Sequence, residues 1–392
     1  MLPDTNAALV SVARHTAYNF VGAVVPLAVL LVTVPLYLEV IGLERYGILA
    51  ICWLLVGYFN LFDFGLGKAT AQKIATLADA PPDERNRVFW TSGLMSLLLA
   101  LIAALAFLPL AALALPMMTG NDPALLGEVT AALPLLVAAI PLAIFQSLFK
   151  GALEGRREFL KINAVLAFGT IATGVLPLLA AYLVDIRLQV LILVTLLCRA
   201  AVVLLLVAAC VPTGPLGRPR LSSASEFRGL LRFGGWTTIT NVVGPVMIYF
   251  DRFAIGAILG AASVALYVVP FNLVSQLAVL PAAFATAVFP RIAGSDATEE
   301  RLLGEESLRL LACVLTPATL VMAALLGPFL MLWLGMETGA AAAPVGHVLL
   351  FGLWANSLAR IAIARLQARG RADLPAAAHL AQGIPYLLLL YP

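Results

Sequence analysis

The sequence predicts an all-α polytopic membrane protein, and three observations support this class. Of the 392 residues 62% are hydrophobic, the mean hydropathy is +1.01, and only 11% are charged. A soluble domain has about 25% charged residues, so this composition excludes a soluble globule. Apolar stretches near the roughly 20 residues that a membrane-crossing helix needs repeat from one end of the chain to the other. They are too long for the strands of a barrel, so we expect helices.

The apolar stretches define eleven predicted spans, which alternate in direction along the chain. Of the 24 Lys and Arg residues, twenty lie at alternate span ends, whereas Arg45 and Arg187 lie on the opposite side and Arg199 and Arg252 lie inside spans. Cytoplasmic loops are enriched in Lys and Arg, so the N-terminus is predicted to be cytoplasmic. No small-residue cleavage site follows the first apolar run, so we expect no cleavable signal peptide. The predicted spans are 16–38, 46–67, 88–115, 128–150, 161–184, 189–211, 233–260, 264–290, 308–334, 344–366 and 374–392.

A Pro- and Gly-rich segment that begins at Pro212 divides the chain into two predicted lobes. The N-lobe is 1–211 with spans one to six, and the C-lobe is 233–392 with spans seven to eleven. Between them, 212–232 is a cytoplasmic linker, in which Ser223 and Glu226 have the spacing of a capping box that opens an interfacial helix.

The two lobes are predicted to be pseudo-symmetric six-helix bundles that form a parallel repeat. Asn19-Phe20-Val21-Gly22 in the first span is echoed by Asn241-Val242-Val243-Gly244 in the seventh, at an offset of 222 residues. A repeat of six spans, an even number, places both lobes in the same orientation, and such transporters bind substrate between their halves. The second lobe is expected to lack its last helix.

The seventh span, 233–260, carries Asp251 and Arg252 about 13 Å from its end. Ionisable groups at such depth normally face a bundle interior or a wet cavity. Asn241 and Asp251 also belong to a stripe of small and polar residues at steps of three and four, so we expect this stripe to line a central cavity.

Polar residues of the neighbouring spans have the same predicted depth. Arg199 lies about 15 Å from the outer end of the sixth span, so it either lines the cavity or forms a strut with Asp251 between the lobes. Asn272 and Gln276 share one face of the eighth span, where they either bind a substrate or satisfy Asp251 and Arg252.

Four further positions in the N-lobe are candidates. Asn19 lies on a polar face of the first span. Asp63, near the cytoplasmic surface, is either a cavity residue or one half of a helix-end pair with Lys68. Arg14 and Lys150 lie at the predicted cytoplasmic mouth; both also fit ordinary topogenic cations, and the basic turn after Lys150 also suits an anionic headgroup.

Catalytic and metal sites are not expected. The four cysteines lie in apolar spans without paired spacing, so they suit packing rather than a disulfide or a metal site. No predicted outer loop exceeds about a dozen residues, whereas a membrane polymerase or ligase needs a sizeable outer loop with acids, bases or arginines. We expect no catalytic residue, no metal ligand, no cofactor and no nucleic-acid partner.

The sequence resembles the polysaccharide-export and O-antigen flippase branch of the multidrug/oligosaccharidyl-lipid/polysaccharide exporter superfamily. The resemblance covers nearly the whole chain, but two zones carry it. One runs from Ile41 to Gly67, with Phe62-Asp63-Phe64-Gly65-Leu66-Gly67 at its end. The other contains Phe233-Gly234-Gly235-Trp236, Asp251-Arg252-Phe253-Ala254-Ile255-Gly256, Tyr267 and Phe289-Pro290-Arg291.

The resemblance implies translocation of an undecaprenyl-diphosphate-linked oligosaccharide from the cytoplasmic to the periplasmic leaflet of the bacterial inner membrane. It implies alternating access, coupling to H⁺ or Na⁺, and cavity roles for Asp63, Lys68, Asp251 and Arg252. It also implies membrane lipid and other polysaccharide-assembly membrane proteins as partners. A twelfth span, which the family pattern includes, is missing from the predicted C-lobe.

The residues themselves favour the same substrate class but leave alternatives open. A diphosphate-linked sugar needs cations and amides at one depth, which Arg199, Arg252 and nearby amides supply. An ion-coupled drug or small-solute antiporter on a similar two-lobe fold would favour unpaired acids. A polymerase or ligase of the same pathway, the third alternative, would need the large outer loop that is not predicted.

Overall fold

The computed structural model is helical throughout the residues that it describes, with no strand among them. These residues are 5–59, 63, 65–77, 80–119, 122–211, 250–282, 284, 288, 297–368, 374, 377, 378, 381 and 382; for 5–24 and a few helix-end positions only the backbone is described. The chain separates into two compact units, Met1–Val246 and Met247–Pro392, which are taken in turn. The predicted linker at 212–232 lies outside the described residues, so the predicted lobe boundaries stay predictions.

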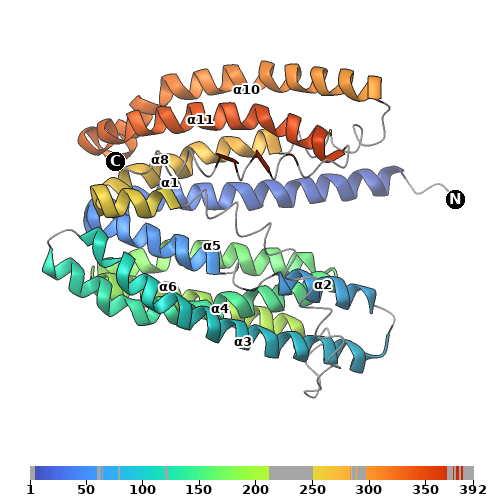
Figure 1. Ribbon diagram of the computed structural model, residues 1–392, viewed down its shortest axis with the longest axis horizontal. Helices are drawn as coiled ribbons and strands as arrows, with labels where there is room; N and C mark the ends of the chain where they lie inside the picture. The colour runs from blue at the N-terminus through green and yellow to red at the C-terminus, as the bar shows by residue number, and fades with distance from the viewer. Residues whose placement is uncertain are drawn as a thin grey trace. The chain divides into compact units, whose positions relative to one another are not determined.

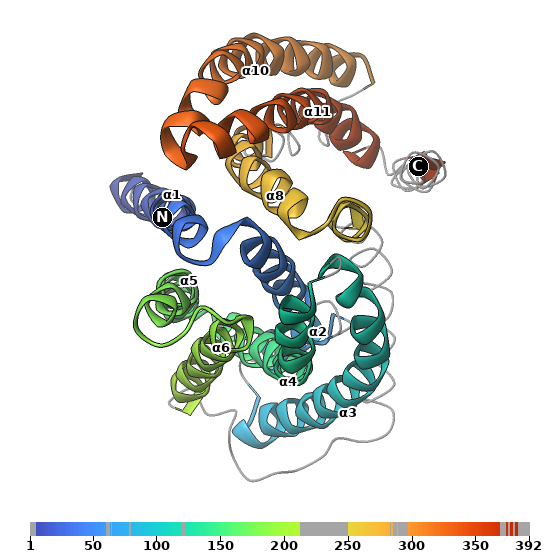
Figure 2. The same cartoon turned by 90° about the vertical axis from the view of Figure 1, so that its left-hand side faces the viewer.

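The first unit is a bundle of long helices (Figures 1 and 2). Its helix α1 covers residues of two predicted membrane segments. Gly42 interrupts the helix between them, with φ 78° and ψ 169°. A positive φ of this kind is readily adopted by glycine alone, so the predicted turn between spans one and two is the break at Gly42. The helices of this unit are α1 (Thr5–Tyr58), α2 (Leu66–Thr76), α3 (Pro82–Ala114), α4 (Pro123–Gly155), α5 (Phe159–Leu183) and α6 (Leu188–Cys210), with a short 3₁₀ helix η2 (Pro116–Thr119).

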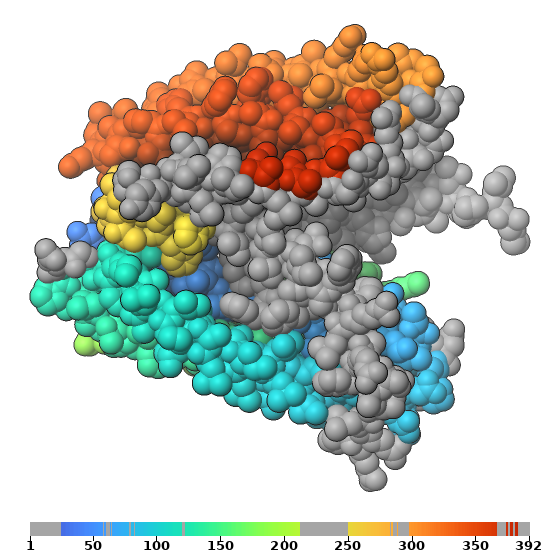
Figure 3. All heavy atoms as spheres, in the orientation of Figure 1, coloured from blue at the N-terminus to red at the C-terminus, as the bar shows by residue number. Residues whose placement is uncertain are grey.

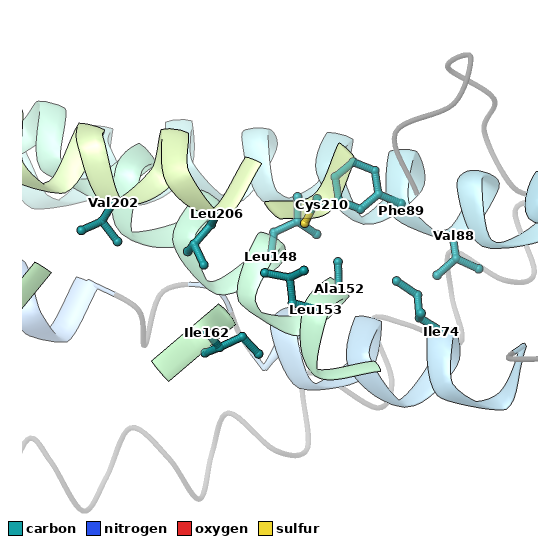
Figure 4. Packing of buried hydrophobic residues seen from close by; sticks show 10 residues of the cluster. All are labelled: Ile74, Val88, Phe89, Leu148, Ala152, Leu153, Ile162, Val202, Leu206 and Cys210. Atoms are coloured by element: carbon teal, nitrogen blue, oxygen red, sulfur yellow. The ribbon is translucent and has the colours of Figure 1, made fainter. Parts of the chain in front are cut away.

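A hydrophobic cluster at one end of the first unit joins five helices (Figure 4). Burial of such side chains is expected to fix the helices against one another, as dispersion contacts add up in a close-packed interior. The cluster consists of Ile74 from α2, Val88 and Phe89 from α3, Leu148, Ala152 and Leu153 from α4, Ile162 from α5, and Val202, Leu206 and Cys210 from α6.

Glycines allow α2 to cross α4 with backbones in contact. A methyl group at Gly151 would collide with the carbonyl oxygen of Gly67, and one at Gly155 would lie 2.7 Å from the carbonyl oxygen of Ala71. Small residues at a helix interface are a common device in membranes, where they permit close backbone approach.

A buried carboxylate, Glu128, holds three helices of the first unit together at their other end. Its side chain is 9% exposed and accepts a 2.7 Å hydrogen bond from Nη2 of Arg45. The second oxygen accepts the backbone N–H of Leu188 at 3.0 Å, at the start of α6. Just before Leu188, Asp185 accepts hydrogen bonds from the backbone N–H and the guanidinium of Arg187, which lower the pKa of Asp185 below its ordinary value.

The second unit contains a helix that is described over 250–259, followed by α8 (Ala261–Ser275), η4 (Gln276–Ala278), α10 (Ala297–Leu334) and α11 (Met336–Ala368). Helices α10 and α11 are joined at Gly335, whose φ is 86°, and they lie side by side on the surface of this unit (Figures 1 and 3). Near the far end of the pair, Nε of Arg365 donates to Oε1 of buried Glu300 at 2.7 Å. A methyl at Gly304 would lie 2.5 Å from Cδ of Arg365, so glycine makes room for the arginine.

Eight helices of the described residues are long and apolar enough to cross a membrane. They account for the predicted spans except those at 233–260 and 374–392, most of whose residues lie outside the described part. Large apolar side chains on these helices are exposed, for example Leu105 of α3 at 75% and Leu332 of α10 at 89%. An apolar exterior of this kind suits a lipid environment, and the predicted fold class is confirmed. The repeat relating the two lobes stays a prediction.

Replacing Gly151 with alanine is expected to destabilise the first unit. The new methyl group must push α2 and α4 apart, and overpacking of this kind costs about 1–3 kcal/mol. Gly127→Ala in the same helix is the matched control, because no atom lies within 4 Å of a methyl at that position. Thermal unfolding of the purified protein in detergent measures both variants. Equal melting temperatures for the two would contradict a tight crossing.

Candidate functional site

Asp251 and Arg252 are brought together with two aromatic rings by a helical hairpin in the second unit. The helix at 250–259 ends at Gly260, whose φ is 83°, and α8 begins at the next residue. Asp251 lies nine positions before Gly260 and Tyr267 seven positions after it. Each residue advances a helix by about 1.5 Å, so the two side chains meet at a similar height on the hairpin.

The carboxylate of Asp251 accepts hydrogen bonds from both arms of this hairpin. Its Oδ1 accepts from the backbone N–H of Arg252 at 2.7 Å and from Nη1 of the same arginine at 2.9 Å. The phenol of Tyr267 donates to Oδ2. Both oxygens are therefore occupied within the second unit.

The guanidinium of Arg252 is enclosed by aromatic rings. Its central carbon lies 4.2 Å from the ring centroid of Phe271 and 5.3 Å from that of Tyr267. The two rings are stacked, with their centroids 6.0 Å apart and an angle of 18° between their planes. The Arg252 side chain is only 2% exposed, whereas that of Asp251 is 18% exposed. Cation–π contacts strengthen when the cation is desolvated, so this arrangement fixes a positive charge inside the bundle.

The cluster as a whole carries no net charge when Asp251 is ionised. Its cation is preoriented, and its anion is the more accessible member. An incoming anion would therefore compete with Asp251 for the guanidinium of Arg252.

Tyr267 and Phe271 belong to this cluster although neither was a candidate from the sequence. In the sequence, Tyr267 was noted only as part of the zone that carries the family resemblance. The signals that could have identified them are the similar distances of Asp251 and Tyr267 from Gly260, and the four-residue step from Tyr267 to Phe271.

Asn272 and Gln276 lie further along the same hairpin arm, where α8 tightens into η4. Nε2 of Gln276 lies 3.4 Å from the carbonyl oxygen of Asn272. Among the described residues the side-chain hydrogen bonds of Asp251 come from Arg252 and Tyr267 instead. Substrate contact by the two amides stays a prediction.

Asp63 organises the start of α2 in the first unit. Its side chain is 7% exposed, and it accepts the backbone N–H of Gly65 at 2.8 Å and that of Gly67 at 3.2 Å. The hydroxyl of Ser147 in α4 also donates to it. Lys68, one turn into α2, is exposed. The carboxylate thus satisfies amide donors at a helix N-terminus, which is a stabilising position for negative charge.

Arg199 lies in the middle of α6, in the first unit. Its Nε is buried and has no hydrogen-bond partner in the described structure. The predicted strut between Arg199 and Asp251 would join the two units and stays a prediction, as does the cavity role of Arg199.

The remaining candidates are only partly described. Lys150 pairs with Glu154 one turn later in α4, with Nζ 3.4 Å from Oε1 and both side chains partly exposed. Arg14 and Asn19 lie in α1, but their side chains are outside the described residues, and Asn241 is outside them entirely.

The second unit also has an apolar groove between α8 and α10. Its volume is about 590 Å³, and it is open to the surface. We call it the α8–α10 groove, and it is lined by Leu273, Pro317, Ala318, Val321, Met322, Leu325, Leu326 and Phe329. Without charged or hydrogen-bonding side chains, it suits a hydrocarbon chain.

Metal-ligand clusters of three or more His, Cys, Asp or Glu residues are absent from the described part of the chain. Cys52, Cys198 and Cys210 are buried, Cys313 is exposed, and the described residues contain no disulfide.

The described helices and their buried ion pair define the class of protein: a multi-pass helical membrane protein with a paired charge inside its second unit. The chain belongs to the polysaccharide biosynthesis protein family, whose sequence model matches residues 12–295. It is 29% identical over 386 residues to a Shigella flexneri protein named "Putative O-antigen transporter", covering 97% of this chain and 90% of that protein.

Solved structures of similar fold come from two kinds of transport protein. An inward-facing multidrug resistance transporter of the MATE family has a TM-score of 0.72 at 15% identity, covering 90% of this chain and 85% of that chain. The lipid II flippase MurJ, in an inward closed conformation, has a TM-score of 0.65 at 12% identity, covering 93% and 77%. At these identities the likeness shows the fold, which the predicted superfamily resemblance anticipated.

Loss of the Arg252 charge is expected to destabilise the second unit. Arg252→Met keeps most of the volume but leaves Asp251 without its cation, and breaking a buried pair in this way costs about 3–5 kcal/mol. Arg301→Ala is the control in the same unit, because Arg301 is 75% exposed and its pair with Glu305 is superficial. Such exposed pairs contribute about 0–1 kcal/mol. If both variants unfold at the wild-type temperature, the cluster does not support the fold.

Proposed function

We propose that the protein is a flippase that moves an undecaprenyl-diphosphate-linked oligosaccharide from the cytoplasmic to the periplasmic leaflet of the bacterial inner membrane. The observation that carries the proposal is the 29% identity to the O-antigen transporter relative, which extends over 97% of this chain. Membership of the polysaccharide biosynthesis protein family points the same way. The fold is shared with a lipid flippase.

The chemistry of the second unit suits both parts of such a substrate, its diphosphate and its isoprenoid chain. A diphosphate is an anion that arginine binds well through paired, charge-assisted hydrogen bonds. Arg252 holds such a charge in the interior, and Asp251 is the accessible group that compensates it. An isoprenoid chain is purely apolar. The α8–α10 groove offers an apolar surface for it on helices that are long and apolar enough to span a membrane.

The remaining parts of the proposal come from the sequence. The distribution of Lys and Arg supports a cytoplasmic N-terminus. We infer that transport proceeds by alternating access of the two lobes and is coupled to H⁺ or Na⁺. Other membrane proteins of polysaccharide assembly are the proposed partners.

A drug or small-solute antiporter is the second candidate function, because the fold is also that of a multidrug transporter with a TM-score of 0.72. That fold is common to both classes and does not separate them. The buried cation at Arg252 favours an anionic substrate over the cationic one that an unpaired acid would suit.

Complementation of a bacterial strain that lacks its O-antigen flippase tests the proposal. The wild-type chain is expected to restore surface glycan. Asp251→Asn and Arg252→Lys are expected to reduce it at least about tenfold, because one removes the compensating charge and the other the planar, doubly donating cation. Arg301→Ala is the control, and immunoblots of membranes establish that all variants are equally abundant.

The outcome also separates the candidate functions. Suppose that the wild-type protein is abundant in strains with different glycans, restores surface glycan in none of them, and confers drug resistance. That result would overturn the flippase proposal in favour of the antiporter. Normal glycan with Asp251→Asn and Arg252→Lys would remove the cluster from the substrate site while leaving the flippase function intact.

Filling the α8–α10 groove is expected to impair export without unfolding the protein. Ala318→Trp places a large ring in the groove, so a lipid chain would lose its contact surface there. Ala324→Trp is the matched control, since Ala324 is exposed on the same helix and does not line the groove. Complementation and thermal unfolding measure both variants. A groove that takes no part in transport would leave the two equal in surface glycan.

A further inference from the structure

His347, the twelfth of the 33 residues of α11, has both ring nitrogens beside carbonyl oxygens. Nδ1 is 2.7 Å from the carbonyl oxygen of Ala343, one turn earlier in α11. Nε2 is 2.9 Å from the carbonyl oxygen of Ala323, which belongs to α10. The ring lies over Gly327 of α10, where a methyl group would be 3.9 Å from its Cε1 atom.

The protonation state of the ring decides how many of these contacts are hydrogen bonds. A carbonyl oxygen can only accept, and a neutral imidazole has a single N–H. In the neutral ring, one nitrogen lone pair therefore faces an oxygen lone pair at hydrogen-bond distance, which is repulsive. The imidazolium donates at both nitrogens and satisfies both carbonyls.

We propose that His347 is a proton-binding site, and that the bound proton ties α11 to α10. The neutral ring keeps one contact, and the bond within its own helix is the shorter of the two. Deprotonation then releases the carbonyl of Ala323 and with it the link between the helices. Transport coupling by this proton rests on the proposed flippase function, whereas the link itself does not.

In the described helices around His347, few other groups could compete for this role. Between 310 and 334, α10 has no Asp, Glu, Lys or Arg, and its titratable residue there is Cys313. Between 338 and 359, α11 has no other ionisable residue. Helix α8, which packs against α11, contributes Tyr267. Within these described helices, charge at this level therefore changes mainly through the imidazole.

Both helices are weakened near this contact. Pro328 follows Ala323 by five residues in α10, and Pro344 precedes His347 by three in α11. Each proline removes one backbone hydrogen bond from its helix. A side-chain link that is made or broken here acts where the helices resist bending least.

Tight packing connects His347 to the Arg252 cluster inside the second unit. At the neighbouring Gly346, a methyl would lie 2.9 Å from Leu326 of α10 and 3.2 Å from Pro270 of α8. Pro270 directly precedes Phe271, whose ring covers Arg252. A shift of α10 relative to α11 would therefore press on α8 at the residue beside the ion pair.

The chemistry of the step is a simple proton transfer. Neutral His347 takes a proton from water to form an imidazolium, and returns it to water when the Ala323 contact breaks. The link is therefore present while the ring is protonated and lost when the proton leaves.

Cysteine cross-linking between α10 and α11 tests the link without any need for substrate. The full chain carries Cys313→Ser together with Leu320→Cys and Phe351→Cys, two exposed positions on facing helices. Thiolate reactivity itself rises with pH, so in lipid nanodiscs the cross-linking rate at each pH is divided by the rate of His347→Gln at the same pH. This ratio is expected to be about fivefold larger at pH 5.5 than at pH 8, because the link holds the two helices together. In His347→Lys, which stays charged, the ratio is expected to be the same at both pH values. His379→Gln is the control and should retain the response.

Selective ¹⁵N labelling of the three histidines, His15, His347 and His379, identifies the titrating ring directly. The signal that disappears in His347→Gln should show both nitrogens protonated at the lower pH. An unchanged pH response of cross-linking in His347→Gln and His347→Lys overturns the inference. Glycan complementation separates this failure from that of the proposed function. If the protein exports glycan and both His347 variants keep the pH response of cross-linking, the proton site alone is wrong. If the pH response depends on His347 but no glycan is exported, only the flippase function is wrong.

Discussion

Buried charge in a membrane protein must be compensated nearby, and three ion pairs of the described structure meet this constraint. Glu128 is matched by Arg45, Glu300 by Arg365 and Asp251 by Arg252, each within one unit. Asp63 is stabilised by amide N–H groups instead of by a cation. An unmatched ion at such a place would cost several kcal/mol. Each matched set consequently fixes the relative position of the segments that supply it.

Local patterns predicted the class of fold and the most unusual side chains. Spanning lengths, the uneven distribution of arginine and lysine, and the out-of-place pair at 251 and 252 are all visible in a linear chain. Partners that are distant along the chain are not. Glu128 meets Arg45 across 83 positions and Arg365 meets Glu300 across 65, and no sequence spacing encodes such a meeting. The same is true of Asp63, whose partners depend on a backbone turn.

The two units achieve close helix packing by different means. In the first, glycine removes side chains so that α2 and α4 touch through their backbones. In the second, aromatic rings and a buried arginine fill the space within the hairpin, and α10 and α11 pack beside each other through apolar side chains. Backbone contact leaves little freedom to slide, since there are no side chains to rearrange. A hairpin held by polar bonds instead depends on a few specific partners, here Asp251, Arg252 and Tyr267.

The neutrality of the Asp251 and Arg252 pair has an electrical consequence. A charge that moves through the membrane field exchanges about 2.3 kcal/mol with each 100 mV of potential. A compensated pair that moves as one body exchanges almost none. Voltage across the membrane would therefore do no work on the empty hairpin, and would act only on charges that arrive from outside it.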